Sequence, residues 1–228
     1  MQLHPNFSYG VDFVGNERQP VLVIDNFLSA PSVAVEFCAE HAKFNNADAF
    51  YPGVRAPVPE VYLHTIHHHL KEIIYSTFAI NDSMVNWVSS DYSMVLTPPD
   101  QLQLAQCIPH YDSLITTELA AVHYLCGADK GGTSFYRHKS TGFESVDTVR
   151  KAIYSQQLVC DLDGADYPHA YINGSNELFD QIASYDAVFN RMIVYRCTSL
   201  HSGNIAPDFL FDENPRSGRL TINTFIGA

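Results

Sequence analysis

A histidine and a carboxylate stand one residue apart in the segment "AQCIPHYDSL", which runs from Ala105 to Leu114. If this segment is extended, His110 and Asp112 project from the same face, because alternate side chains of a strand do so. A neutral imidazole and a carboxylate are two of the three ligands in the 2-His-1-carboxylate triad, which leaves positions open on Fe(II). The sequence therefore predicts metal chemistry here, provided that a second histidine completes the ligand set.

The candidate for the second histidine is His201 in "YRCTSLHSGNIAP", directly after an apolar strand. Further along, "SGRLTINTF" places Arg219 and Thr221 on one face of a late strand. A guanidinium holds a carboxylate through two parallel charge-assisted hydrogen bonds, and a neighbouring hydroxyl adds another. These residues predict a site for the far end of a dicarboxylate, with Arg216 and Arg191 as competing candidates for the arginine.

The order of the motifs resembles a known superfamily. His-x-Asp is followed by "HYLC", "GGTSFY", His201 and Gly218-Arg219, as in the prolyl-hydroxylase-like branch of the 2-oxoglutarate and Fe(II)-dependent oxygenases. The segments "YPGVRAP", "NRMIVYR" and "GRLTINTF" resemble more narrowly a bacterial domain family of unknown function within it. The resemblance implies a double-stranded β-helix core (jelly roll, cupin-like), with Fe(II), the cosubstrate 2-oxoglutarate and dioxygen. It implies as metal ligands His110, Asp112 and His201, and around the cosubstrate Arg219, Thr221 and Tyr124.

The resemblance also bears on the reaction. Related halogenases replace the carboxylate ligand with a small residue, so the presence of Asp112 favours hydroxylation or desaturation. Arg137 and Arg55 are each either a substrate contact or a structural ion-pair former. Two alternatives come from other functional classes. A cupin-like metal isomerase or hydrolase would not need the inward Arg219, and a non-catalytic binding protein on the same fold would need no intact triad.

The elements that must position these residues can be read from the hydrophobic pattern. A strand at Val21–Asp25 leads into a helix that Ser29 caps, and a second helix runs from about Pro59 to Ala79, after a Pro-rich loop at 50–59. From Trp87 onward, short segments rich in β-branched and aromatic residues predict antiparallel strands.

We expect one domain over 1–228, mainly β with α (α+β). Residues 1–86 form an N-terminal strand and helical layer in this prediction, and 87–228 form the double-stranded β-helix. A helical insertion at 145–189 contains two helical patterns, "VDTVRKAIYSQQL" and "NELFDQIASYDAVF".

Composition excludes several classes of protein. A net charge of −12 over 228 residues disfavours nucleic acid as a partner. No apolar run approaches the length of about 20 residues that a membrane span needs. The five cysteines are odd in number and form no CxxC pair, which predicts reduced thiols and a cytoplasmic location. We expect a small molecule or an amino-acid or peptide side chain as substrate, and the oligomeric state, including a homodimer, stays open.

Overall fold

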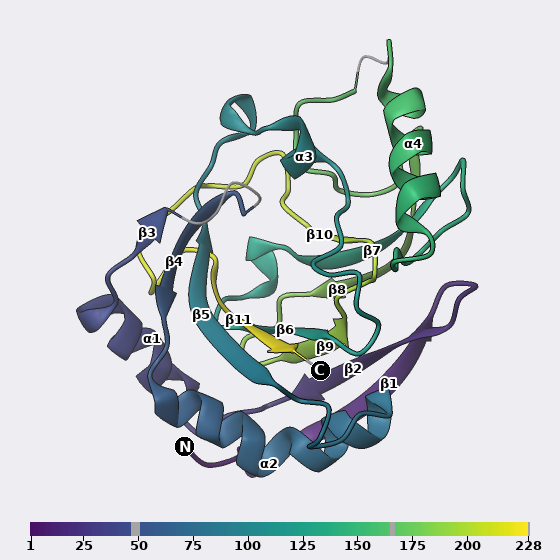
Figure 1. Ribbon diagram of the computed structural model, residues 1–228. Coiled ribbons are helices and arrows are strands. Elements are labelled where there is room, and N and C mark those ends of the chain that lie inside the picture. Colours follow the sequence, from purple (N-terminus) through teal and green to yellow (C-terminus); the bar gives the residue numbers. More distant parts are fainter. Residues whose placement is uncertain (47–50, 165–166, 228) are drawn as a thin grey trace.

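The computed structural model describes residues 1–46, 51–164 and 167–227, which form two antiparallel sheets with helices around them (Figure 1). The larger sheet has the strand order β1-β2-β9-β6-β11-β5-β4-β3, and the smaller has the order β10-β7-β8. The strands of the larger sheet are β1 (Ser8–Val14), β2 (Gln19–Asp25), β3 (Asn45–Asn46), β4 (Gly53–Pro57), β5 (Trp87–Val95), β6 (Leu119–Tyr124), β9 (Met192–Arg196) and β11 (Leu220–Gly227). Those of the smaller sheet are β7 (Gly132–His138), β8 (Phe179–Asp186) and β10 (His201–Gly203).

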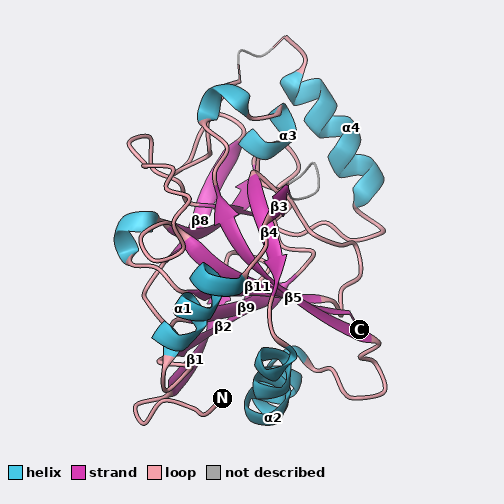
Figure 2. Ribbon diagram, turned by 90° about the vertical axis from the view of Figure 1, so that its left-hand side faces the viewer, coloured by secondary structure: helices cyan, strands magenta, loops and turns pink. Residues whose placement is uncertain are grey.

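Helices lie on the outside of this β-structure. The α-helices are α1 (Pro31–His41), α2 (Glu60–Phe78), α3 (Leu104–Cys107) and α4 (Lys151–Leu162), with 3-10 turns η1 (Pro99–Gln101) and η2 (Ala128–Lys130). In Figure 2, α2 lies at one end of the molecule beneath the larger sheet, and α3 and α4 lie at the opposite end. Buried residues of α1 and α2 share one core cluster with the outer face of the larger sheet.

The alternation of side chains along β6 shows how the sheet separates two cores. Leu119 and Ala121 pack toward the helices, whereas Ala120 and Val122 pack inward. The inward cluster also contains Phe135 from the smaller sheet, so the two sheets share an interior. Side chains that are to act in this interior must therefore occupy the inward positions of the strands.

The structure confirms most of the predicted elements. The strand before the first helix, the helix from about Pro59 to Ala79 and the antiparallel strands after Trp87 are all present. The predicted Ser29 cap is wrong, because Ala30 is the N-cap residue and no side chain caps the helix. Pro31 within the first turn removes one of the unpaired N–H groups that a cap would satisfy.

Two other predictions are corrected. The Pro-rich stretch at 50–59 contains β4, since its prolines lie at or beside the strand ends and leave the pairing with β5 intact. Within 145–189 the first helical pattern gives α4, but the second gives β8, which pairs with β7 over seven residue pairs. The apolar residues of this segment recur at helical spacing, but the segment forms a strand because it pairs with the open edge of β7.

Two further observations concern the cysteines and the helices. Cys38, Cys107, Cys126, Cys160 and Cys197 are all free thiols. None of the described helices combines the length and apolar character that crossing a bilayer requires.

Candidate metal centre

Two separate segments bring together the predicted metal ligands. His110 and His201 form an isolated antiparallel bridge, in which each backbone N–H donates to the other residue's carbonyl at 2.9 Å. The N–H of Asp112 donates to the carbonyl of Cys197 at 2.8 Å, just past the end of β9. The His-x-Asp segment is thus held between β10 and β9. It is not part of a strand, but its alternation still directs both side chains to one place.

The donor atoms of His110, Asp112 and His201 lie within 4.8 Å of one another. Asp112 Oδ1 is 3.7 Å from His110 Nε2, and Asp112 Oδ2 is 3.5 Å from His201 Nε2. Ligands about 2.1 Å from a first-row metal ion in neighbouring coordination positions lie about 3 Å apart, so small side-chain movements would bring this set onto one ion. Two imidazoles and one carboxylate fit the facial triad of non-heme iron.

The protonation of the histidines suits ligation. His201 is buried, and its Nδ1 lies 2.9 Å from the carbonyl of Ser199, which fixes Nδ1 as the donor and leaves Nε2 with its lone pair. The His110 side chain is 47% exposed, yet loss of water around it, with the neighbouring His201, lowers its pKa to about 4. Arg55 lowers this pKa further, and Asp112 opposes the shift. His110 is therefore neutral at pH 7 and able to bind a metal ion.

A row of four inward residues crosses the larger sheet. Arg55 on β4 is opposite Ser93 on β5, which is opposite Thr221 on β11, which is opposite Tyr124 on β6. Thr221 and Tyr124 are fully buried, and the Tyr124 hydroxyl donates to Thr133 Oγ1 at 2.7 Å. The predicted Thr221 and Tyr124 are thus direct neighbours on the interior face.

Arg219 lies two residues before Thr221 and is buried. Its Nε donates to the carbonyl of Lys130 at 3.1 Å, and its Nη2 to that of Gly132 at 2.9 Å. Within the described residues it forms no ion pair with a carboxylate. Burial raises the pKa of Tyr124 to about 12, and the charge of Arg219 opposes this shift. The two side chains are therefore close enough to interact electrostatically. A buried guanidinium with no acidic partner is a strong candidate for binding an anion.

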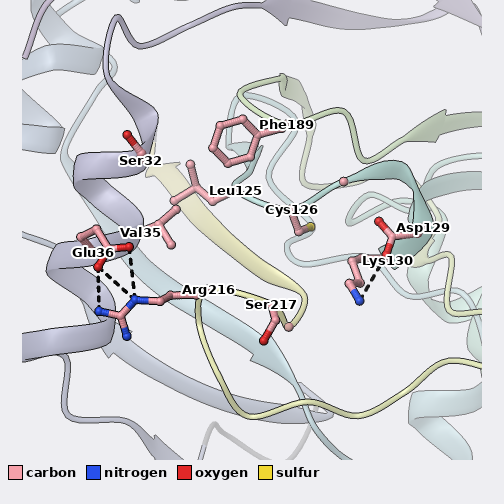
Figure 3. Close-up of a pocket in the computed structure, with 12 residues that line it drawn as sticks. Ser32, Val35, Glu36, Leu125, Cys126, Asp129, Lys130, Phe189, Arg216 and Ser217 are labelled. Atoms are coloured by element: carbon pink, nitrogen blue, oxygen red, sulfur yellow. Dashed lines mark hydrogen bonds and ion pairs between the residues drawn. The ribbon is translucent and has the colours of Figure 1, made fainter.

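The competing arginines are occupied elsewhere. Arg191 Nε donates to Asp25 Oδ1 at 2.7 Å. Arg216 Nη2 donates to Glu36 Oε2 at 2.6 Å in a pocket of about 360 Å³ against α1 (Figure 3). Cys126 also lines this pocket, but the metal-ligand candidates do not. Both arginines are ion-paired to carboxylates, so of the three arginines proposed for the cosubstrate only Arg219 lacks an acidic partner among the described residues.

The structure also places the predicted substrate contact. Arg137 donates from Nε and Nη2 to Glu144 Oε1, at 2.8 and 2.6 Å. Glu144 is buried, and this ion pair joins β7 to the segment that follows it. The substrate contact of Arg137 stays a prediction.

Sequence reasoning missed some of the groups around the site. Tyr195 packs its ring 4.7 Å from that of His201, and burial together with the charge of Asp112 raises its pKa well above the usual value. The alternation of "RMIVYRC" puts Ile193, Tyr195 and Cys197 on one face, which is the signal that could have found it.

Several solved structures have a similar fold, and some of them depend on or bind 2-oxoglutarate (alpha-ketoglutarate). SnoK, a non-heme alpha-ketoglutarate dependent carbocyclase from nogalamycin biosynthesis, is 13% identical, with 92% of this chain and 79% of that one covered and a TM-score of 0.50. HygX from Streptomyces hygroscopicus, solved with nickel, 2-oxoglutarate and hygromycin B, is 9% identical over 91% and 82%, also with a TM-score of 0.50. A prolyl-4-hydroxylase from Pseudomonas putida matches at 12% identity over 97% and 91%, with a TM-score of 0.45.

Likeness at these identities shows the fold alone, and it confirms the predicted double-stranded β-helix of the 2-oxoglutarate and Fe(II)-dependent oxygenases. The chain belongs to DUF6445, a family of unknown function, whose pattern matches residues 5–226. Membership in a family of unknown function with this fold was the narrower prediction from the sequence, and it is confirmed. A search of the curated proteins gives no match to this chain.

Proposed function

We propose that this protein is an Fe(II)- and 2-oxoglutarate-dependent oxygenase that hydroxylates a small molecule or an amino-acid or peptide side chain. The observation that carries the proposal is the convergence of two imidazoles and one carboxylate, from segments far apart in the sequence, within 4.8 Å. This donor set occurs on a fold whose solved examples include enzymes that use 2-oxoglutarate.

Each residue has a definite task in this function. His110, Asp112 and His201 would hold Fe(II), which when bound supplies the activation of dioxygen, with 2-oxoglutarate as the source of electrons. Arg219 would bind the distal carboxylate of the cosubstrate, beside the hydroxyls of Thr221 and Tyr124. The buried row around Thr221 excludes water from this end of the site.

Asp112 bears on the type of reaction. Its carboxylate occupies one coordination position, and a protein that lacked it would offer that position to a halide instead. Hydroxylation is therefore the proposed outcome, with desaturation as the variant that depends on substrate geometry.

The test is to measure metal binding and 2-oxoglutarate turnover together. Purified wild-type protein is loaded with Fe(II) under argon, and succinate formation is followed after oxygen is admitted. Asp112→Ala and His201→Ala should lose metal binding and succinate formation, whereas His64→Ala, on the exposed face of α2, should match the wild type. Wild-type protein that holds the metal but never binds 2-oxoglutarate would move a cupin-like isomerase or hydrolase to first place. Protein that holds no metal would favour a non-catalytic binding protein.

The partners and location follow the same proposal. A small substrate suits an interior site, and the acidic chain disfavours nucleic acid. We also propose a cytoplasmic location, which the five free thiols support.

A further inference from the structure

A second arginine, Arg55, faces the interior beside the metal-ligand candidates. It lies on β4, in the same row across the sheet as Thr221 and Tyr124. Its guanidinium carbon is 4.5 Å from the centre of the Tyr51 ring and 5.8 Å from that of Phe225. These two rings hold a planar cation in a fixed orientation.

The Phe225 contact shows which way the Arg55 side chain extends. Phe225 is opposite Ala120, and Ala120 is opposite Tyr195, whose ring packs against that of His201. Arg219 precedes Thr221 in the sequence, whereas Phe225 follows it, so the two residues lie on opposite sides of this row. The Arg55 guanidinium therefore reaches from that row toward the metal-ligand candidates, while Arg219 lies toward the opposite end.

The charge of Arg55 has no carboxylate partner among the described residues. Its Nε is buried and makes no hydrogen bond, and among the described residues no carboxylate forms an ion pair with it. Arg196 and Arg219 also form no ion pair with a described acid, but both donate to backbone carbonyls. Four other arginines are paired with acids: Arg137, Arg150, Arg191 and Arg216. An unpaired guanidinium in a partly buried place costs free energy unless an anion from outside binds it.

We infer that Arg55 binds a carboxylate of the primary substrate, so that the substrate is a small organic acid or an amino acid or peptide with a free carboxylate near the reacting carbon. This inference rests on the proposed oxygenase function. The cosubstrate has one distal carboxylate, and the fully buried surroundings of Arg219 suit it. Arg55 is partly exposed, which suits a ligand that arrives from solvent after the cosubstrate has bound.

The experiment uses the full chain with arginine side chains labelled with ¹⁵N, loaded with Zn(II) as a diamagnetic metal and saturated with 2-oxoglutarate. The Nε–H signal of Arg55 is assigned from its loss in Arg55→Gln, and that of Arg216 from its loss in Arg216→Gln. The probes are three acids and their matched amides: acetate and acetamide, benzoate and benzamide, N-acetylglycine and N-acetylglycinamide. Thermal unfolding confirms that each variant folds, and Arg55→Lys provides a second variant that retains the charge.

We expect the acids to shift the Arg55 signal saturably and the matched amides to bind more weakly by about tenfold or by a larger factor. The Arg216 signal should not move. Arg55→Gln should change the affinity for 2-oxoglutarate by less than about twofold. An Arg55 signal that ignores all three acids, or follows acids and amides equally, overturns the inference. Loss of 2-oxoglutarate binding in folded Arg55→Gln also overturns it, since Arg55 would then serve the cosubstrate. Wild-type protein that fails to bind 2-oxoglutarate refutes the oxygenase function itself, which is a distinct result.

Discussion

Replacing Arg219 by Gln should weaken the binding of 2-oxoglutarate by about two to four orders of magnitude. A guanidinium has five N–H donors, and Arg219 uses Nε and one hydrogen of Nη2 for the carbonyls of Lys130 and Gly132. The edge formed by Nη1 and the second Nη2 hydrogen makes no bond to a described residue and can meet a carboxylate with two parallel hydrogen bonds. Each such bond to a charged group contributes about 1.5–3 kcal/mol, so their loss costs about 3–6 kcal/mol. At about 1.4 kcal/mol per factor of ten, this gives the stated range.

The assay is an anaerobic calorimetric titration of 2-oxoglutarate into protein loaded with Mn(II). Arg216→Gln removes the same charge outside the interior, at an exposed ion pair with Glu36, and serves as the matched control. Its dissociation constant should stay within about twofold of the wild type. If folded Arg219→Gln retained the wild-type affinity, or Arg216→Gln lost it, the assignment of Arg219 to the cosubstrate would be wrong.

Two predictions concern stability. Burial lowers the pKa of His123 from 6.5 to about 4, so the unfolded chain takes up this proton first as the pH falls. The stabilisation of the folded state by neutral His123 is complete above pH 6.5 and is lost between pH 6.5 and 4. The free energy of unfolding should fall by about 3 kcal/mol over this range. In His123→Gln the free energy of unfolding, measured with urea, should depend less on pH between pH 6.5 and 4. The same pH dependence as in the wild type would contradict the prediction. Gly53→Ala should destabilise by about 1–3 kcal/mol, because its Cβ would meet the Met94 carbonyl at 1.9 Å. Gly10→Ala, with nothing within 4 Å, should have little effect on the melting temperature, and equal losses in both variants would refute the steric reason.

Much of the fold could be predicted because its strands carry strong local signals. The segments that became β5, β6, β7, β9 and β11 are short and rich in β-branched and aromatic residues. The errors arose where pairing with a neighbour decided the structure. The segment of β8 has apolar residues at helical spacing, but the edge of β7 binds it as a strand. β4 contains proline, yet it pairs with β5 through residues that proline does not obstruct.

The candidate site could be predicted because its residues can be recognised without knowing how the strands pair. His110, Asp112 and His201 are recognisable from residue type and order, even though the segment of the first two forms a bridge rather than a strand. What the sequence could not separate were the arginines, because their roles depend on their partners. In the structure Arg137 is ion-paired to Glu144, whereas no described acid forms an ion pair with Arg55, and residue order alone does not reveal this difference.

The most direct test of the central claim is an anaerobic titration of Fe(II) and 2-oxoglutarate, monitored by the weak visible charge-transfer band of the chelate. The band reports the metal and the cosubstrate in one complex, so it requires the triad and a cosubstrate site together. Wild-type protein should develop the band at a stoichiometry of one per chain, and Asp112→Ala should not, while Asp100→Ala, at an exposed position, should behave as the wild type. Wild-type protein that demonstrably holds Fe(II) but develops no band with 2-oxoglutarate would contradict the oxygenase function.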